Sequence, residues 1–489
     1  MSTHSQSKPE KSSVDSATRA ALGTVDSSLK LPALFFTVCA ILWLIVANAA
    51  ALVTSIQSYY PEFLSGSPWF TYGRLYPFAS NVMLFGWGCN AIFAVALWLI
   101  ARLSLAPVRD GGIIFIAGLF WNFGLELGIL KILLGEFIPV ESLELPGYVT
   151  PIMLIAYTVI GAWGVRVFLT RKKKTASVSQ WYILGALFWF PWIYIIAQFM
   201  VVWFPVRGVL QSVVGHWFNA SFLNLWFTPV ALAAAYYLIP KILGRPIYSY
   251  SLALFGFCSL ALVGGWTGTI YMIGGPVPIW LSSAGTAASV IMIMPVGVVV
   301  LNLFLTARGA WAELWHSLAL RFVLFGIVSY LLAGIFGAAM GLHSVSKVLH
   351  FTTAISAYQQ QIVYAFFSMV MFGGLYFIVP RLSGREWPSV DLIYLHFWGS
   401  AIGILVVVFA LFIGGCISGI QMNDPEVPFI EIVESLVIWS KVSSIGIVCL
   451  AVGHIAFAVN FFWMLVAGHL VTSGQGPIVL ESTKQEGRA

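Results

Sequence analysis

The sequence has little charge and little histidine for its length. Of its 489 residues only 9% are charged and eight are histidine, whereas 60% are hydrophobic. So few charged side chains cannot cover a soluble globular domain of this size, which excludes that class of protein. No Cys-x-x-Cys-His motif occurs, so covalently attached c-type haem is excluded as well. The five cysteines show no paired spacing and are typical of small packing residues.

Long apolar runs occupy nearly the whole chain. Each run reaches about 20 residues or more, the length that a helix needs to cross the hydrocarbon core of a bilayer. The ten-residue alternation of membrane β-strands is not seen. The sequence therefore predicts an all-α polytopic membrane protein. Its twelve runs lie at 33–58, 78–105, 111–134, 148–170, 180–204, 212–239, 249–274, 279–306, 318–342, 350–379, 393–419 and 431–470.

The basic residues are distributed unevenly between the two sides of the predicted bundle. When the loops are assigned alternately to the two sides, 18 of the 24 basic residues fall on the side of both termini. They are Lys8, Lys11, Arg19, Lys30, Arg102, Arg109, Arg171, Lys172, Lys173, Lys174, Lys241, Arg245, Arg308, Arg321, Arg381, Arg385, Lys484 and Arg488. The positive-inside rule then predicts cytoplasmic termini in a bacterial inner membrane. The net charge of +6 reflects this topology and does not indicate a nucleic-acid partner.

Three segments differ in composition. Residues 1–30 are polar and rich in Ser and Thr, without the apolar core of a cleavable signal, and are predicted to be a disordered cytoplasmic tail. Residues 31–472 form the predicted twelve-helix membrane domain. Residues 473–489 are predicted to be a second cytoplasmic tail. No extramembrane segment is long enough to be a separate domain.

Four stretches carry a family resemblance. They are "PWFTYGRLYPFASNVMLFGWGCNAIFA", "YYLIPKILGRPIYSYSL", "GGLYFIVPRLSGREWPS" and "HFWGSAIGI". In order and spacing they resemble helix 2, the link between helices 6 and 7, the end of helix 10 and the start of helix 11 in subunit I of cbb3-type cytochrome c oxidases, the C-family of haem-copper oxidases. The resemblance covers roughly residues 33–470. It implies a haem-copper oxidase subunit I-like bundle of about twelve transmembrane helices.

The resemblance also implies where the metal ligands of that family would lie. Two histidines bind a low-spin haem, one binds a high-spin haem and three bind copper; an axial donor and several nitrogen ligands are what iron and copper need in such sites. A His-x-His pair in helix 10 serves the two haems, and an adjacent pair in helix 7 serves copper. The residues at these positions are Ala79 in helix 2, Ala220 in helix 6, Ile270 and Tyr271 in helix 7, and Tyr358 and Gln360 in helix 10.

Some residual candidates remain. His216 precedes Ala220 by about one helical turn and becomes the copper ligand if the alignment contains an insertion. Tyr330 falls where the family keeps an active-site tyrosine, although a packing role is favoured without copper. His350 and His396 coincide with family histidines that are not metal ligands. We therefore expect no cofactor, with haem b or copper bound only through unusual ligation, for instance by Tyr358.

Several ionisable residues lie within or near the apolar runs. They are Glu126, Lys131, Arg166, His343, Lys347, Glu434 and Lys441. Such groups are costly at membrane depth and usually face a polar interior or one another. Structural pairing is the favoured interpretation; an ion or proton path and an interface with another subunit are the alternatives.

Three functions are compatible with these features. The first is a non-catalytic, oxidase-like subunit that contacts the bilayer and other membrane subunits, such as a c-type cytochrome subunit. The second is an active oxygen or nitric oxide reductase whose ligands are displaced to His216, His343, His350 or His454. The third is a transporter or channel that uses the emptied haem cavities. We expect bulky residues such as Phe78, Tyr271, Tyr358, Phe366 and Phe367 to fill the vacated haem volume, because an empty cavity is costly.

Overall fold

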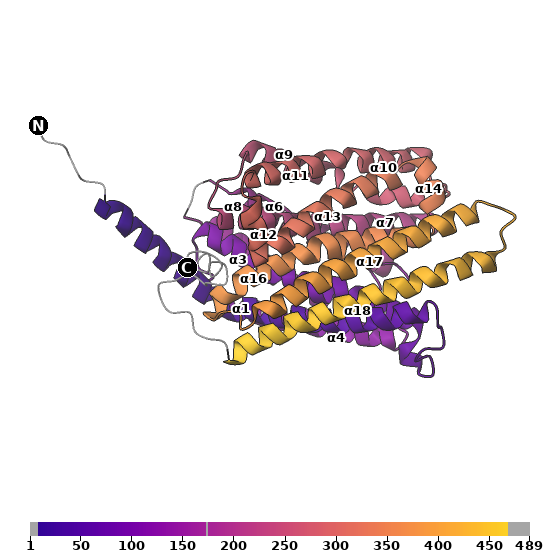
Figure 1. The fold of residues 1–489 in the computed structure, drawn as a ribbon, viewed down its shortest axis with the longest axis horizontal. Helices are drawn as coiled ribbons and strands as arrows, with labels where there is room; N and C mark the ends of the chain where they lie inside the picture. The colour runs from indigo at the N-terminus through magenta and orange to yellow at the C-terminus, as the bar shows by residue number, and fades with distance from the viewer. Residues whose placement is uncertain (1–7, 173–174, 468–489) are drawn as a thin grey trace, which may run out of the picture.

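The computed structural model describes residues 8–172 and 175–467 of the chain. Within them, twelve helical segments are long and apolar enough to cross a membrane, which confirms the predicted architecture. They run side by side along the long axis of the molecule (Figure 1). The carboxyl-terminal tail predicted at 473–489 lies outside the described residues.

Six spans are single α-helices and six are composite. The single helices are α1 (Lys8–Gln57), α4 (Gly111–Leu133), α5 (Thr150–Leu169), α13 (Leu318–Met340), α17 (Val390–Met422) and α18 (Phe429–Ala467). Three composite spans on the outside of the bundle are α6 (Val178–Gln198) with η3 (Phe199–Trp203), α9 (Tyr250–Val263) with η5 (Thr267–Met272), and α10 (Ile279–Ile291) with α11 (Ile293–Ala307). Short helices lie between spans: η1 (Pro68–Phe70), α12 (Trp311–His316) and α14 (His343–Leu349).

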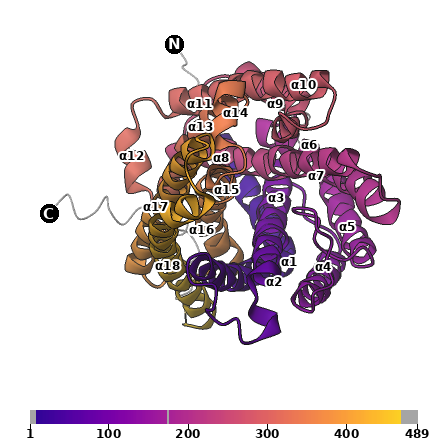
Figure 2. The ribbon, with the colours of Figure 1, turned by 90° about the vertical axis from the view of Figure 1, so that its right-hand side faces the viewer.

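The remaining three spans share a distinctive form, in which a π-helical segment joins two α-helices. They are α2 (Tyr72–Asn81), η2 (Val82–Gly88) and α3 (Cys89–Ser104); α7 (Val209–Phe222), η4 (Leu223–Phe227) and α8 (Thr228–Leu243); and α15 (Thr353–Gln360), η6 (Gln361–Ser368) and α16 (Met369–Ser383). In the most apolar stretch of each of these spans, 94%, 94% and 100% of the residues are buried, against 50% or less in the other nine spans. Figure 2 looks along the bundle and shows these spans at its centre.

Helix α1 differs from the sequence-based expectation of a disordered tail at residues 1–30. The helix begins at Lys8, and its part from Ala20 onward packs against the bundle. Val25 and Leu29 are fully buried, and the Asp26 carboxylate forms an ion pair with Arg102. The apolar spacing of these residues, together with that ion pair, outweighs the polar composition around them.

Helices α17 and α18 form a long antiparallel pair that extends beyond the other spans at one end of the molecule (Figure 1). Glycines let the two backbones approach closely: a Cβ atom on Gly399 would lie 3.2 Å from Gly453, and one on Gly446 would lie 2.7 Å from the Gly403 carbonyl oxygen. Small residues at a contact are a common way for membrane helices to associate. The last apolar run, predicted at 431–470, is the single helix α18 as far as Ala467, where the described residues end.

The two ends of the bundle are named here by their charge. The start of α1 and the end of α18 lie at the same end (Figure 1), together with the loops after α3, α5 and α8; we call this the basic end. The loop at 134–149 and the α17–α18 turn lie at the opposite, acidic end. This arrangement has the even number of spans that the charge asymmetry predicts.

Candidate functional site

The six predicted ligand positions separate into two cavities inside the bundle. Ala79 and Gln360 line the first, which we call the Ala79 cavity. Ala220, Ile270, Tyr271 and Tyr358 line the second, which we call the Tyr358 cavity. The positions therefore lie together in space as the resemblance implies, although none of them carries an imidazole.

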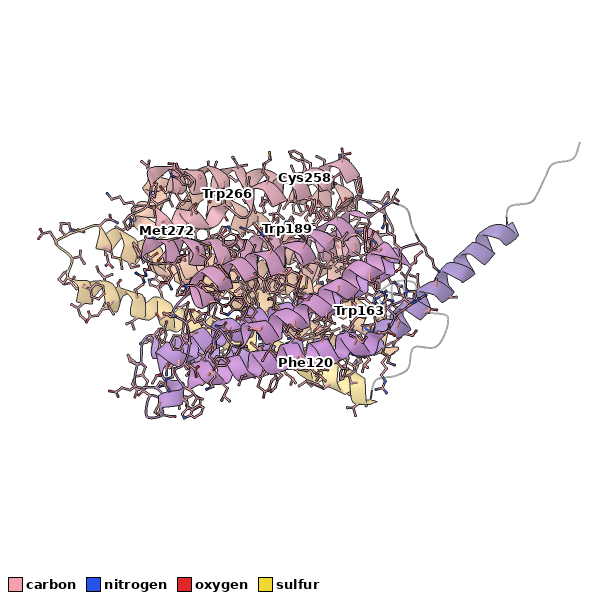
Figure 3. All side chains as sticks on the ribbon, turned by 180° about the vertical axis from the view of Figure 1, so that it is seen from behind. Phe120, Trp163, Trp189, Cys258, Trp266 and Met272 are labelled. Carbon is pink, nitrogen blue, oxygen red and sulfur yellow. The ribbon has the colours of Figure 1, made fainter. Side chains whose placement is uncertain are left out.

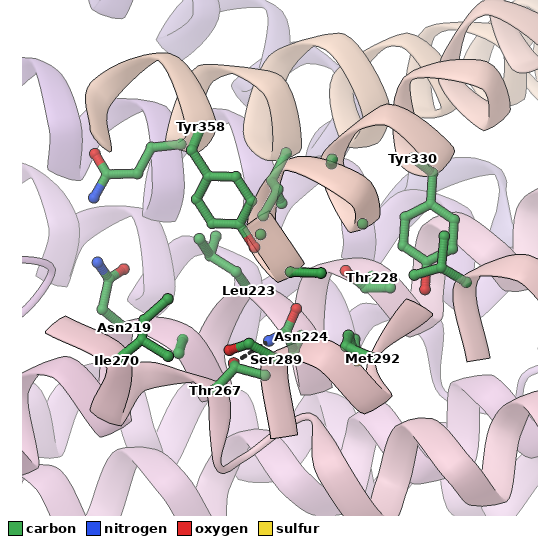
Figure 4. A pocket seen from close by; sticks show the side chains of 18 of the residues that line it. Asn219, Leu223, Asn224, Thr228, Thr267, Ile270, Ser289, Met292, Tyr330 and Tyr358 are labelled. Atoms are coloured by element: carbon green, nitrogen blue, oxygen red, sulfur yellow. Dashed lines mark hydrogen bonds between the residues drawn. The ribbon is translucent and has the colours of Figure 1, made fainter. Parts of the chain in front are cut away.

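The Tyr358 cavity is small, with a volume of about 50 Å³, and it shares Asn219, Leu223 and Gln359 with the Ala79 cavity. Figure 4 shows the Tyr358 ring reaching into it from α15 and Ile270 bordering it from η5. A Cβ atom on Gly337 would lie 2.7 Å from the Tyr358 hydroxyl, so the ring packs against bare backbone there. The expected filling by bulky side chains therefore holds at this site.

Tyr330 also lines the Tyr358 cavity, where the resemblance places the active-site tyrosine. Its ring packs on that of Phe366, with 4.5 Å between the ring centroids. Its hydroxyl is buried and has no hydrogen-bond partner among the described residues. The contacts of Tyr330 are thus those of a packing aromatic.

The Ala79 cavity, in contrast, has a volume of about 310 Å³. Gln360 is exposed although its helix lies at the centre of the bundle, because its side chain faces this cavity. Side chains therefore fill this region only in part: a cavity remains, although it is smaller than a porphyrin requires. The physical reason is the size of the replacements: Ala79 is small, and Phe78 beside it is buried without lining the cavity.

Hydroxyl and amide groups dominate the polar part of this lining, and the described lining contains no Lys or Arg. The polar lining residues are Asn48, Thr54, Ser55, Ser58, Tyr72, Tyr76, Ser80, Glu141, Ser142, Asn219, Thr353, Ser356, Gln359, Gln360, Tyr364, Ser440, Ser443 and His454. Ser58 and Tyr72 are exposed at the acidic end, so the cavity reaches from the surface into the bundle.

His454 on α18 lies at the inner wall of the Ala79 cavity, where sequence reasoning had not placed it. It is 1% exposed, and its Nε2 atom forms a hydrogen bond with the Tyr364 hydroxyl, which also donates to Ser400 at 3.2 Å. The Nδ1 atom of His454 has no partner among the described residues. His396 packs nearby, 6.3 Å away between ring centroids, and bonds the Tyr376 hydroxyl at 2.8 Å.

The other candidate histidines do not join His454. His216 on α7 packs against the Tyr271 ring, with centroids 5.3 Å apart. His350 caps the end of α14 and packs against the Phe351 ring. His343 is exposed at the start of α14. Among the residues that the structure describes, no group of three or more His, Cys, Asp or Glu side chains is arranged to hold a metal ion.

A third cavity, of about 360 Å³, adjoins the Ala79 cavity at the acidic end and shares Tyr72, Tyr76 and Glu141 with it. Glu144 lines it and is buried; burial raises the pKa of this carboxyl to about 7, and a hydrogen bond from Asn81 at 2.9 Å opposes the rise. Burial also raises the pKa of Glu141, to which Gln359 donates at 2.5 Å. Glu141 is exposed, but the surface it exposes faces the cavities that it lines.

The residues present do not fit the groups that the resemblance implies. A low-spin haem needs a donor on each face, and Ala79 and Gln360 supply no imidazole. A cavity of about 150 Å³ holds benzene, and a porphyrin is several times larger than benzene, whereas the Ala79 cavity measures about 310 Å³. The Tyr358 cavity, at about 50 Å³, holds neither a haem nor three nitrogen ligands for copper.

Three of the seven ionisable residues noted within or near the spans have partners, and all three are cations. Lys131 pairs with Glu136 at 3.0 Å, and Arg166 approaches Asp110 at 4.0 Å. Lys441 lies over the ring of Tyr59, 5.9 Å from its centroid. These contacts agree with the favoured structural interpretation for these cations and do not form a continuous path through the bundle.

Comparisons with known proteins agree with this architecture. Residues 32–449 match the family described as Cytochrome C and Quinol oxidase polypeptide I. A cytochrome c oxidase subunit 1 homolog of Azorhizobium caulinodans is 25% identical over 90% of this chain and 83% of its own length. The cbb3-type cytochrome c oxidase subunit CcoN1 of Stutzerimonas stutzeri is 26% identical over 89% of this chain and 92% of its own. The chain therefore belongs to the haem-copper oxidase subunit I family.

Proposed function

We propose that the protein is a non-catalytic member of this family, an integral membrane subunit that retains the oxidase scaffold without its oxygen-reducing centre. The observation that carries the proposal is the Tyr358 cavity. The positions of the copper and high-spin haem ligands border a space of only about 50 Å³ and include Ile270 and Tyr358. Function depends on the site and not on the fold, and here the site has neither donors nor room.

The cbb3 branch is the proposed origin of the chain, as a paralogue that has lost its metal ligands. The similarity to the cbb3-type subunit of Stutzerimonas stutzeri over 92% of that protein supports this assignment. The Tyr-Gly-Arg-Leu-x-Pro and Arg-Pro-x-Tyr-Ser-Tyr motifs support it independently. Its proposed location is a bacterial inner membrane with both termini in the cytoplasm, which the basic end of the bundle supports.

The proposed role is that of an accessory or structural partner in a respiratory membrane complex. The lipid bilayer and other membrane subunits are its proposed contacts, and a c-type cytochrome subunit is one such neighbour. The support is membership of the oxidase family together with the twelve membrane spans, because the predicted ligand positions are altered while the scaffold is kept.

The decisive experiment is a cofactor and activity measurement on the purified full-length protein. We expect no haem by the pyridine haemochrome assay, no stoichiometric copper by elemental analysis and no consumption of oxygen or nitric oxide. A ligand-complete relative, expressed and purified identically, serves as the positive control for haem loading. One haem per chain, or turnover of either gas, would contradict the proposal and favour an active reductase with displaced ligands.

The Ala79 cavity favours a second candidate function, the binding or transport of a small polar solute. Its volume of about 310 Å³ and its adjoining cavity of about 360 Å³ form a route from the acidic end into the bundle, and hydroxyl, amide and carboxyl groups line part of that route. A Gln360→Cys variant should then react with a membrane-impermeant thiol reagent added on the periplasmic side, whereas Ala220→Cys, which lines only the small Tyr358 cavity, should not. Equal protection of both cysteines would remove the basis for this candidate.

A further inference from the structure

Helix α4 presents a continuous apolar face to the surroundings of the bundle. Its exposed side chains recur every three or four residues and include Ile116, Phe120, Phe123 and Leu130, each between 45% and 56% exposed. Figure 3 shows Phe120 on the outside of the molecule, on the helix at the edge of the bundle. This face is where lipid or another membrane helix must lie.

One carboxylate interrupts this apolar face. Glu126 is exposed and lies between Phe123 and Leu130 on the same side of the helix. At 1.5 Å per residue it lies about 10 Å along the axis from Leu133, where α4 ends. Since α4 is about as long as the hydrocarbon core is thick, Glu126 is well inside the apolar region.

The chain supplies no partner for this carboxylate among the described residues. The nearest cation along the helix, Lys131, is engaged with Glu136 at 3.0 Å. The neighbouring polar residue, Asn122, bonds inward to Trp43 at 2.8 Å and to Asn90. No ion pair or hydrogen bond of the described residues includes Glu126. Ionisable groups at membrane depth normally pair with another group or face a polar interior, and Glu126 does neither within this chain.

We propose that the outward face of α4 docks a transmembrane helix of another membrane subunit, and that this helix carries a Lys or Arg at the depth of Glu126. The complementary charge satisfies the carboxylate, and the apolar stripe packs the partner helix on both sides of the ion pair. This inference rests on the proposed function, because it names the kind of neighbour that the accessory subunit takes.

A second copy of this chain is a poorer occupant than a basic helix. A two-fold axis along the membrane normal would place two Glu126 carboxylates at the same depth across an isologous contact. Like charges facing each other in a medium of low dielectric constant repel strongly. Lipid alone leaves the carboxylate without a partner.

The test uses the purified full-length protein in lipid vesicles and synthetic single-span peptides as probes. Each peptide is a labelled Leu/Ala helix of about 21 residues, with either Lys or Leu about 10 Å from the acidic-end interface. Energy transfer from the labelled protein measures binding. We expect the Lys peptide to bind at least tenfold more tightly than the Leu peptide, which corresponds to about 1.4 kcal/mol.

Two variants make the result specific to the carboxylate. Glu126→Gln keeps the shape of the side chain and should abolish the preference for the Lys peptide. Glu431→Gln, which changes an exposed carboxylate in the first turn of α18, should leave the preference intact. A thermal unfolding midpoint equal to that of the native protein shows that each variant is folded.

The proposal is overturned if the Lys and Leu peptides bind native protein equally, or if Glu126→Gln retains the preference. A second result would also overturn the proposal. If energy transfer occurs between two differently labelled copies of the protein, and Glu126→Gln changes it, the face of α4 serves self-association. None of these results depends on the haem and gas-consumption assays. The proposed interface and the proposed non-catalytic role can therefore be contradicted independently of each other.

Discussion

Truncation of Tyr358 tests whether this side chain fills the space at the predicted copper and high-spin haem positions. The ring packs against both hydrophobic clusters of the bundle and lies 5.6 Å from Phe336 between centroids. Tyr358→Ala should free about 100 Å³, and at about 24 cal/mol per Å³ the cavity alone costs about 2.4 kcal/mol of unfolding free energy. The new space adjoins the existing volume of about 50 Å³ and has about the size of the ring that was removed, so it should accept a small aromatic molecule.

The assay follows from that volume. We expect the thermal unfolding midpoint of detergent-solubilised Tyr358→Ala to fall and to recover on addition of phenol, which replaces the missing ring. Gln360→Ala, two residues along the chain, is the matched control: its side chain borders the Ala79 cavity, so truncation enlarges an existing space and should cost less than about 1 kcal/mol. Equal losses in the two variants, with no phenol rescue, would refute the argument that Tyr358 fills the site.

Three further outcomes are expected. The pKa of Glu144 in the folded protein is about 7, above its ordinary value of 4.5. As pH rises, the unfolded chain therefore loses this proton first, and the free energy of unfolding should fall by about 3 kcal/mol between pH 4.5 and 8. In thermal melts, the unfolding midpoint of Glu144→Gln should depend less on pH than that of the native protein, whereas the pH dependence of Glu62→Gln should be unchanged. Gly419→Ala should lower the unfolding midpoint, because its Cβ would lie 1.9 Å from the Val348 carbonyl oxygen, whereas Gly297→Ala meets nothing within 4 Å. Reporters fused after Ala489 should be active only in the cytoplasm; activity of a periplasmic reporter would contradict the topology.

The number of spans and the grouping of the ligand positions could be predicted from the sequence. Hydropathy alone defines the spans, because a helix that crosses a bilayer needs a long apolar run. The motifs then set the register of the central helices, and the structure places Ala79 with Gln360 and Ile270 with Tyr358 accordingly. Each of these inferences depends on local composition or on motif spacing, which a single sequence contains.

The position of His454 and the volume of the Ala79 cavity depend on three-dimensional packing and were not predicted from the sequence. The position of His454 is set by the close contact of α17 with α18, which no motif near it signals. The volume of the Ala79 cavity is a sum over many helices and cannot be obtained from two substituted positions. The start of α1 had a usable signal, since Val25, Leu29 and Ala33 recur at helical spacing and are all fully buried.

The π-helical segments of the three central spans lie next to the predicted ligand positions. In each central span the segment begins within three residues of a position where the family resemblance implies a metal ligand: η2 after Ala79, η4 after Ala220 and η6 after Gln360. π-helical segments are rare in proteins overall, and those that occur are often found at functional sites. Their backbone thus still presents the ligand positions to two common cavities. The fate of each cavity follows from the residues presented: rings and branched chains close one, whereas Ala79 and Gln360 leave the other open.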